Sequence, residues 1–178
     1  PVVISCTGAT ASRNYMPGLT EAYYRKLPVL AITSHRGEQA IGHLFDQQID
    51  RRSIPNDIAV CSVTVPLVKE SADVNFCFIE ATKAILALSH RGGGPAHINM
   101  YTGYSQDFSV KELPKVRKIE RLTAFDELPV IAEGKRVAIF IGSHKPFSQS
   151  ETTAIDNFCE AHDAVVFCDH TSGYKGKY

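Results

Sequence analysis

The sequence predicts an α/β protein: a parallel sheet with crossover helices, followed by the start of a second unit of the same class. Short runs rich in β-branched residues alternate along the chain with segments whose apolar residues recur every three or four positions. This alternation is typical of parallel strands, because each strand must return through a crossover long enough to hold a helix. Periodicity is lost over residues 101–116, so we expect two units, 1–104 and 117–178, joined by a linker over residues 105–116.

Strands and helices are expected to alternate through the first unit. Strands are predicted at residues 2–4, 29–33 and 96–100, and one or two more within 58–68. A helix is predicted over residues 14–26, with Pro17 in its first turn, where a missing N–H costs little. A second helix is predicted from Ser71 or Asp73 to Leu88. Its inward face is expected to hold Phe78, Ala81, Ile85 and Leu88.

The second unit is predicted to begin with a helix over residues 123–133 and a strand over 136–141. A helix over 148–161, with Ile155 and Phe158 inward, leads to a strand over 164–168. The second unit shows only two strands, which are too few for an independent α/β domain. Neither of the two units is expected to be complete in this chain.

Composition bounds the class of protein. Nineteen basic and nineteen acidic residues cancel, which predicts neither a nucleic-acid partner nor a membrane surface as partner. No apolar run approaches the roughly 18 residues that a membrane span requires. The five cysteines are odd in number, widely spaced and mostly set in apolar runs, which predicts buried reduced thiols in a cytoplasmic protein. They are Cys6, Cys61, Cys77, Cys159 and Cys168.

Three loops follow predicted strands, where open α/β sheets bind ligands: 5–14, 34–47 and 142–147. The first is dense in small residues, either as a plain turn or to let a ligand lie against the backbone. It lacks the lysine and the glycine spacing of nucleotide motifs. In the second loop, Arg36 can clamp a carboxylate and Gln47 can read the edge of a heterocycle; the alternative is a solvated loop.

Metal and nucleophile motifs are absent from the sequence. The seven histidines show no metal-ligand spacing, and no Ser-His-Asp or Cys-His arrangement can be argued. We therefore predict no metal-ligating residues in this chain. His97 lies in the middle of a predicted strand, where it is expected to be a hydrogen-bonded core residue.

Residues 7–34, TGATASRNYMPGLTEAYYRKLPVLAITS, resemble the pyrimidine-binding domain of thiamine-diphosphate-dependent enzymes of the acetolactate synthase type. That family shows a Thr-Ser-Gly-Pro-Gly-Ala-Thr-Asn turn, a helix containing Gly-Leu and a Pro-Val-Leu-Ala-Ile-Thr strand. The match runs without gaps from Thr7 to Gln47. Locally the chain is more similar to the menaquinone-pathway synthases of this superfamily, with which it shares Thr10, Pro17, Arg36, Gln47, Ile49 and the run Gly94-Pro95-Ala96-His97-Ile98-Asn99.

The resemblance covers residues 1–104 well, as the second half of a pyrimidine-binding domain. It extends weakly over 117–178, as the start of a Rossmann-like central domain. It implies thiamine diphosphate and Mg²⁺ as cofactors, with the metal site outside this chain. It further implies that the pyrimidine ring lies against Thr7, Thr10, Ala11, Asn14 and Gln47, and that Arg36 meets the substrate carboxylate.

The turn departs from the family pattern at several positions. Thr10 stands where many members have proline, Ala9 and Ala11 stand where they have glycine, and Asp46 replaces an aromatic residue. Each added methyl group narrows the slot beside the ring.

The resemblance also implies that the catalytic glutamate lies upstream of residue 1 and that the Gly-Asp-Gly metal segment lies beyond Tyr178. We therefore expect an internal fragment of a 2-oxo acid decarboxylase or carboligase, a lyase or transferase. The fragment is expected to be inactive alone, and the intact protein is expected to act on a small 2-oxo acid as a homodimer or homotetramer.

Two alternatives remain open at this point. One is a non-catalytic ligand-binding or assembly domain that keeps the fold, which the altered turn favours. The other is a nucleotide-binding Rossmann protein based on residues 136–178, although Gly142 is a single glycine where that fingerprint needs three.

Overall fold

A computed structural model describes residues 1–104, 107–113, 115–132 and 134–178. The chain divides into two compact units, Pro1–Arg121 and Leu122–Tyr178, and each is described by itself. Both are α/β units with parallel strands, so the predicted fold class is confirmed.

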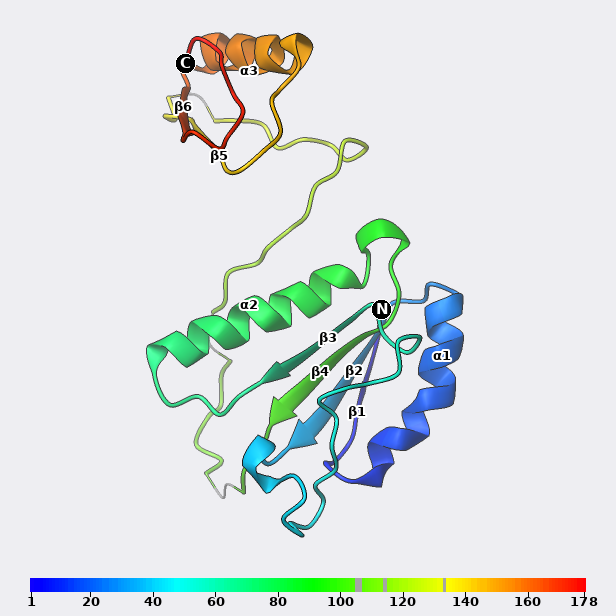
Figure 1. Cartoon of the computed structure of the whole chain (residues 1–178). Coiled ribbons are helices and arrows are strands. Elements are labelled where there is room, and N and C mark those ends of the chain that lie inside the picture. Colours follow the sequence, from blue (N-terminus) through cyan, green and yellow to red (C-terminus); the bar gives the residue numbers. More distant parts are fainter. Residues whose placement is uncertain (105–106, 114, 133) are drawn as a thin grey trace. The chain divides into compact units, whose positions relative to one another are not determined.

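The first unit is built on a four-stranded parallel sheet (Figure 1). Its strands are β1 (Val2–Ser5), β2 (Val29–His35), β3 (Cys61–Val65) and β4 (Ala96–Tyr101). Their order is β1-β2-β4-β3, so β2 and β4 are central. Because all four strands run the same way, their carboxyl ends lie at one edge of the sheet, which is where both predicted ligand loops of this unit begin.

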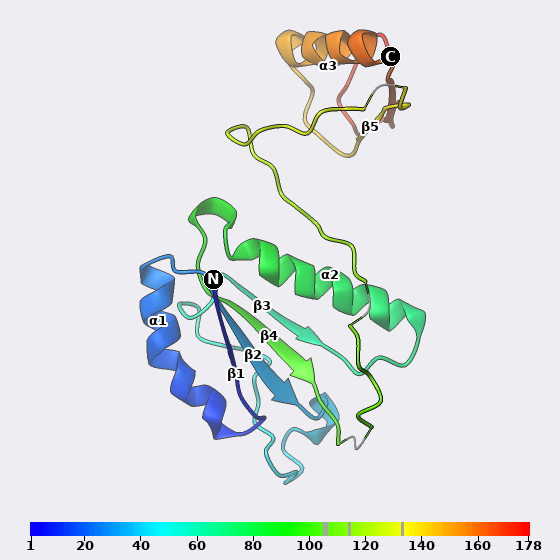
Figure 2. The ribbon, with the colours of Figure 1, turned by 180° about the vertical axis from the view of Figure 1, so that it is seen from behind.

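Helices cover both faces of this sheet. The first helix, α1 (Met16–Tyr24), follows a 3-10 helix η1 (Thr10–Tyr15), and the second is α2 (Ser71–Ala87). Short 3-10 turns, η2 (Glu38–Ala40) and η3 (His90–Gly92), complete the unit. Figures 1 and 2 show α1 beside β1 and α2 beside β3. Adjacent residues of β2 separate the two faces, because Ala31 packs with Leu19 of α1 whereas Leu30 packs with Ala84 of α2.

Helix α2 differs from its prediction in two details. Its N-cap is Glu70, which forms a reciprocal capping box with Asp73, rather than Ser71 or Asp73. Of its predicted inward residues, Ala81 and Leu88 do pack on the sheet, whereas Ile85 is 51% exposed and the neighbouring Ala84 is fully buried. The residues packed on the sheet are Cys77, Ala81, Ala84 and Leu88. The helix is apolar on more than one side, so spacing alone permitted either stripe, and the small Ala84 is the one the sheet accepts.

The second unit holds two parallel strands, β5 (Ala138–Ile141) and β6 (Val165–Cys168), joined by helix α3 (Gln149–His162). Ser148 caps α3 in a capping box with Glu151, as the predicted start implied.

The predicted helix over 123–133 is wrong for the residues described there. The backbone forms only a turn, in which the N–H and hydroxyl of Thr123 both donate to the Asp126 carboxylate at 2.7 Å. Such local side-chain bonds compete with helix formation, and Pro129 lacks the N–H that a helix interior requires.

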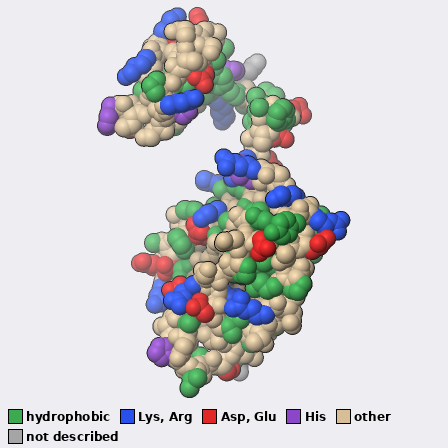
Figure 3. All heavy atoms as spheres, turned by 45° about the vertical axis from the view of Figure 1, so that its right-hand side comes forward, with side chains coloured by type: hydrophobic (Ala, Val, Ile, Leu, Met, Phe, Trp, Pro, Cys, Tyr) green, Lys and Arg blue, Asp and Glu red, His purple; other side chains and the backbone are tan. Residues whose placement is uncertain are grey.

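The cysteines are free thiols. Cys159 alone among them is buried and Cys168 is exposed, so the expectation of general burial was wrong. Within the described ranges, no helix is both long and apolar enough to span a bilayer. On the face shown in Figure 3, basic and acidic side chains are interspersed rather than gathered by sign.

Candidate functional site

Gly8 brings the two predicted binding segments together at the carboxyl edge of the sheet. A Cβ atom at this position would lie 2.5 Å from the carbonyl oxygen of Gln47 and 3.2 Å from that of Ser34. Only glycine leaves room for so close an approach of backbone to backbone. The turn after β1 and the segment around Gln47 therefore form one continuous wall.

In the 3-10 helix η1, residues three apart in sequence lie on the same side. Its six residues therefore form three sides, each with two residues. Ser12 and Tyr15 share the side that faces the sheet. Ser12 is 3% exposed and its hydroxyl donates to the Ala9 carbonyl at 3.1 Å. The Tyr15 hydroxyl donates to the Ser5 carbonyl at the end of β1. This side fastens the turn to the strand that precedes it.

The other two sides of η1 carry the predicted contacts. Ala11 and Asn14 share one side, half-buried and exposed respectively. Thr10 shares the other with Arg13, whose guanidinium donates to the Asp50 carbonyl at 3.1 Å. The Thr10 side therefore faces the segment that follows Gln47.

The exposed polar side chains of this wall are uncommitted. Among the described residues, no hydrogen bond is formed by the side chains of Thr7, Thr10, Asn14 or Gln47, all of which are exposed. Two hydroxyls and two carboxamides supply both donors and acceptors. That donor set fits the edge of an aminopyrimidine, which also carries both. Gln47 adopts a left-handed backbone (φ 53°), a conformation that few non-glycine residues hold without support from their surroundings.

Beneath the wall, the α1 face of the sheet carries a buried polar ladder. The ring of His97 lies 2.9 Å from the Ser62 hydroxyl at Nδ1 and 2.8 Å from the Thr33 hydroxyl at Nε2. Thr33 donates its proton to Asn99 Oδ1 at 3.0 Å, so Nε2–H must donate to Thr33 and Ser62 must donate to Nδ1. Burial, with a smaller effect of the charge on Arg51, lowers the pKa of His97 to about 4, which keeps the ring neutral. The expectation of a satisfied core histidine is confirmed.

Arg51 joins this ladder to the turn. Its Nε donates to Asn99 Oδ1 at 3.2 Å, and one terminal nitrogen donates to the Gly8 carbonyl at 2.6 Å and the Ser12 hydroxyl at 3.1 Å. The other terminal nitrogen donates to the carbonyl of Ser34. Sequence reasoning missed Arg51, because nothing local distinguishes it from the exposed Arg52 beside it.

Arg36 lies outside the wall, in a cavity of about 350 Å³. Its backbone N–H donates to Gln48 Oε1 at 3.0 Å, and its guanidinium carbon lies 4.1 Å from the centre of the Tyr104 ring. No ion pair within the described part of the chain engages its guanidinium. Stacking on a ring leaves the guanidinium edge free to bind a carboxylate.

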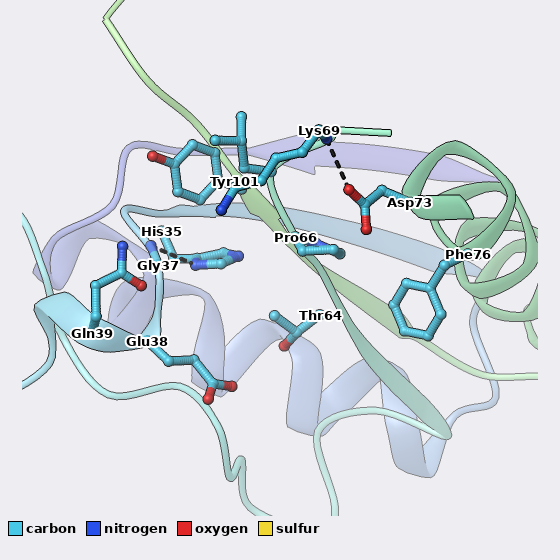
Figure 4. A pocket seen from close by; sticks show the side chains of 11 residues that line it. His35, Gly37, Glu38, Gln39, Thr64, Pro66, Lys69, Asp73, Phe76 and Tyr101 are labelled. Atoms are coloured by element: carbon cyan, nitrogen blue, oxygen red, sulfur yellow. Dashed lines mark hydrogen bonds between the residues drawn. The ribbon is translucent and has the colours of Figure 1, made fainter. Parts of the chain in front are cut away.

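A larger cavity of about 470 Å³ opens at the same edge, between the last residues of β2, β3 and β4 and the first turns of α2 (Figure 4). The rings of His35 and Tyr101 lie on one side of it and that of Phe76 on the other. His35 was predicted to lie in a loop but is the buried last residue of β2. Its Nδ1 accepts the Gly37 N–H at 3.0 Å, so Nε2–H donates to the Val65 carbonyl at 3.1 Å. Burial lowers the pKa of His35, and the ring is neutral.

In the described ranges, no group of three histidine, cysteine or acidic residues is placed to hold a metal ion.

The fold is a parallel α/β unit whose carboxyl edge presents exposed hydroxyl and carboxamide groups. No family model matches the chain. Comparison with curated proteins supports the thiamine-diphosphate-dependent superfamily, and it does not point to the acetolactate synthase type within it.

The relatives are proteins named 2-succinyl-5-enolpyruvyl-6-hydroxy-3-cyclohexene-1-carboxylate synthase. Those of Bacteroides thetaiotaomicron and Phocaeicola vulgatus are 32% and 33% identical over 122 residues, which is 68% of this chain and 22% of each relative. The Flavobacterium johnsoniae protein is 27% identical over 183 residues, covering 97% of this chain and 32% of the relative. The chain thus spans between about a fifth and a third of the length of these relatives.

Proposed function

We propose that the chain is part of a thiamine-diphosphate-dependent enzyme that decarboxylates a 2-oxo acid and joins the remaining fragment to an acceptor, as a lyase or transferase. The observation that carries this proposal is the close approach of Gln47 to the turn at Gly8, which unites the two segments that the resemblance assigns to the pyrimidine ring. The relatives' names, which denote a synthase of a cyclohexene carboxylate, favour a carboligase over a simple decarboxylase.

The proposal assigns residues 1–104 to a partial pyrimidine-binding domain, 105–116 to a linker and 117–178 to a partial central domain. Thr7, Thr10, Ala11, Asn14 and Gln47 would hold the pyrimidine ring. Bound thiamine diphosphate would supply the electron sink for decarboxylation. The chain's own part is to orient the ring through hydroxyl and carboxamide groups on a wall fixed to β1 and β2.

Arg36 would bind the carboxylate of the 2-oxo acid. Its guanidinium is held by Tyr104 and is free of acidic partners among the described residues. We expect Arg36→Ala to raise KM for a dicarboxylic 2-oxo acid by an amount equivalent to about 2–3 kcal/mol, and to change KM for pyruvate much less. Steady-state kinetics of the full-length protein measure this. Arg25→Ala is the matched control, because Arg25 is exposed and, among the described residues, pairs only with Glu21 on α1. Equal, small effects on both substrates would remove Arg36 from the site.

The intact protein is proposed to be a cytoplasmic homodimer or homotetramer, with Mg²⁺ held by a segment outside this chain. Sedimentation of the full-length protein tests the assembly.

A second candidate is a non-catalytic ligand-binding or assembly domain of the same fold. The observation that favours it is the side-chain bulk that Ala9, Thr10 and Ala11 add to the turn. A gene that encodes a glutamate upstream of Pro1 and a Gly-Asp-Gly segment downstream of Tyr178 would speak against it.

Isothermal titration of the full-length protein with thiamine diphosphate and Mg²⁺ tests the proposal. We expect saturable binding, and a 178-residue chain that is inactive alone. The absence of binding at millimolar cofactor would contradict it.

A further inference from the structure

Arg51 is a buried charge without a counter-charge. The residue is 3% exposed, and no ion pair of the described residues includes it. Its guanidinium donates four hydrogen bonds, and all four acceptors are neutral oxygens: two backbone carbonyls, one side-chain carboxamide and one hydroxyl. Burying a cation without a counter-charge is costly, which makes the guanidinium of Arg51 a candidate for a specific role.

The four acceptors belong to three separate segments that meet at one place. Gly8 and Ser12 belong to the turn after β1, Ser34 lies near the end of β2, and Asn99 lies in β4. A planar guanidinium reaches all of them because its donors point in fixed, divergent directions. A lysine ammonium has no such geometry.

The anchor on the sheet is itself fixed. Asn99 Oδ1 accepts from Thr33 as well as from Arg51, and Thr33 is held in turn by the neutral His97 ring. The position of Arg51 is therefore set by the central strands, and Arg51 sets the position of the turn. Arg51 also lies only four residues after Gln47, the other half of the wall.

We propose that Arg51 is a positioning residue for the cofactor-binding wall: it ties the turn at residues 8–12 to the ends of β2 and β4. This inference rests on the proposed function. Arg51 lies beneath the turn and acts through Gly8 and Ser12, whereas the exposed side chains above it would meet the pyrimidine ring.

Two titrations of the full-length protein with Mg²⁺ present test this role. One uses thiamine diphosphate; the other uses inorganic pyrophosphate, which shares the diphosphate and lacks the pyrimidine. We expect Arg51→Met to weaken thiamine diphosphate binding by about 10–100-fold, by analogy with the loss seen when residues that orient metal ligands are replaced. Pyrophosphate binding should change little. Arg52→Met is the matched control, because Arg52 is exposed and its ion pair in the described part of the chain is with Asp50. This substitution should leave both affinities unchanged.

Unchanged thiamine diphosphate affinity in Arg51→Met would overturn the inference, and so would an equal loss for both ligands, which is the signature of a general structural role. If Arg51→Met does not fold, Arg51→Lys is tested in the same way, because lysine keeps the positive charge but lacks the divergent donors of the guanidinium. If the unsubstituted protein binds no thiamine diphosphate, the proposed function fails instead. Hydrogen exchange at residues 8–15 then tests whether Arg51 holds the turn to the sheet, independently of any ligand. Faster exchange in Arg51→Lys supports the inference, and unchanged exchange overturns it.

Discussion

The two faces of the four-stranded sheet have opposite characters although they share the same strands. The face toward α2 is apolar along its length, with Leu30, Val63, Val65, Ala96 and Ile98 packed together. The face toward α1 is mixed. Ala31 packs there with Leu19 of α1, but the polar His97 lies level with Ala31 in the sheet. Thr33 and Asn99, the next pair along the same face, are also hydrogen-bonded polar residues.

This difference arises between neighbouring residues, since successive side chains of a strand point to opposite faces. In β4, Ile98 belongs to the α2 face and Asn99 to the polar ladder. In β2, Thr33 enters the ladder directly after Ile32, which packs toward α2. The α2 face supplies stability through burial, whereas the α1 face uses buried hydrogen bonds to hold a loop in place. Separate variants can therefore weaken one function without the other.

The largest stability effect should come from the apolar face. Ile98→Ala should lower the free energy of unfolding by about 2–5 kcal/mol, because it leaves a cavity against Ala84 and Val63. Thiamine diphosphate affinity should stay unchanged in the folded protein. Urea denaturation and cofactor titration measure the two quantities. Ile79→Ala is the control, because Ile79 lies on α2 with 51% exposure and should cost far less. A loss of affinity in Ile98→Ala would show that the faces are coupled.

The stability that the polar face contributes should depend on pH, through His97. The pKa of His97 falls from 6.5 to about 4 on folding, so between these values the unfolded chain binds a proton that the native chain does not. The stabilisation is therefore complete above pH 6.5 and is lost as the pH falls toward 4, by about 3 kcal/mol in total. Unfolding free energies across this range measure the loss.

His97→Gln should flatten that part of the pH profile, whereas His162→Gln, an exposed substitution at the end of α3, should leave it in place. An NMR titration that found His97 protonated near pH 6.5 would contradict the assignment of the ladder.

The smallest loss of stability is expected for a substitution at Gly8, which should nevertheless weaken cofactor binding at the wall. Gly8→Ala must displace the Gln47 carbonyl, at a cost of about 1–3 kcal/mol, and should weaken thiamine diphosphate binding. Gly18→Ala is its counterpart in α1, where a Cβ meets nothing within 4 Å and should stabilise the helix by about 0.5–1 kcal/mol. Thermal unfolding and cofactor titration compare the two. Equal behaviour of the two variants would mean that the wall does not depend on this close approach.

Most of the first unit could be predicted from its sequence because strand signals there are local. The strands predicted over residues 29–33 and 96–100 both formed near their predicted bounds. The inward face of α2 was predicted only in part. Ala81 and Leu88 were correct, but the helix is apolar on more than one side, so spacing could not choose Ala84 over Ile85. The helix expected around Pro129 was wrong because local Thr-Asp bonding outweighed the apolar spacing.

The site was predictable only in part. The resemblance brought out Thr7, Asn14 and Gln47, and the structure places their segments together at Gly8. Arg51 and His35 could not be found in this way. Their roles depend on partners 48 and 30 residues away in sequence, at Asn99 and Val65, and no local pattern encodes such contacts.

Hydrogen exchange of the full-length protein with and without thiamine diphosphate and Mg²⁺ tests the central claim most directly, because it shows whether the ligand lies at the turn after β1 or at the cavity beside α2. The account predicts slower exchange in residues 8–15 and 46–51, with α2 and the cavity at Phe76 unchanged. Protection confined to α2 and that cavity, or protection nowhere in the first unit, would contradict it.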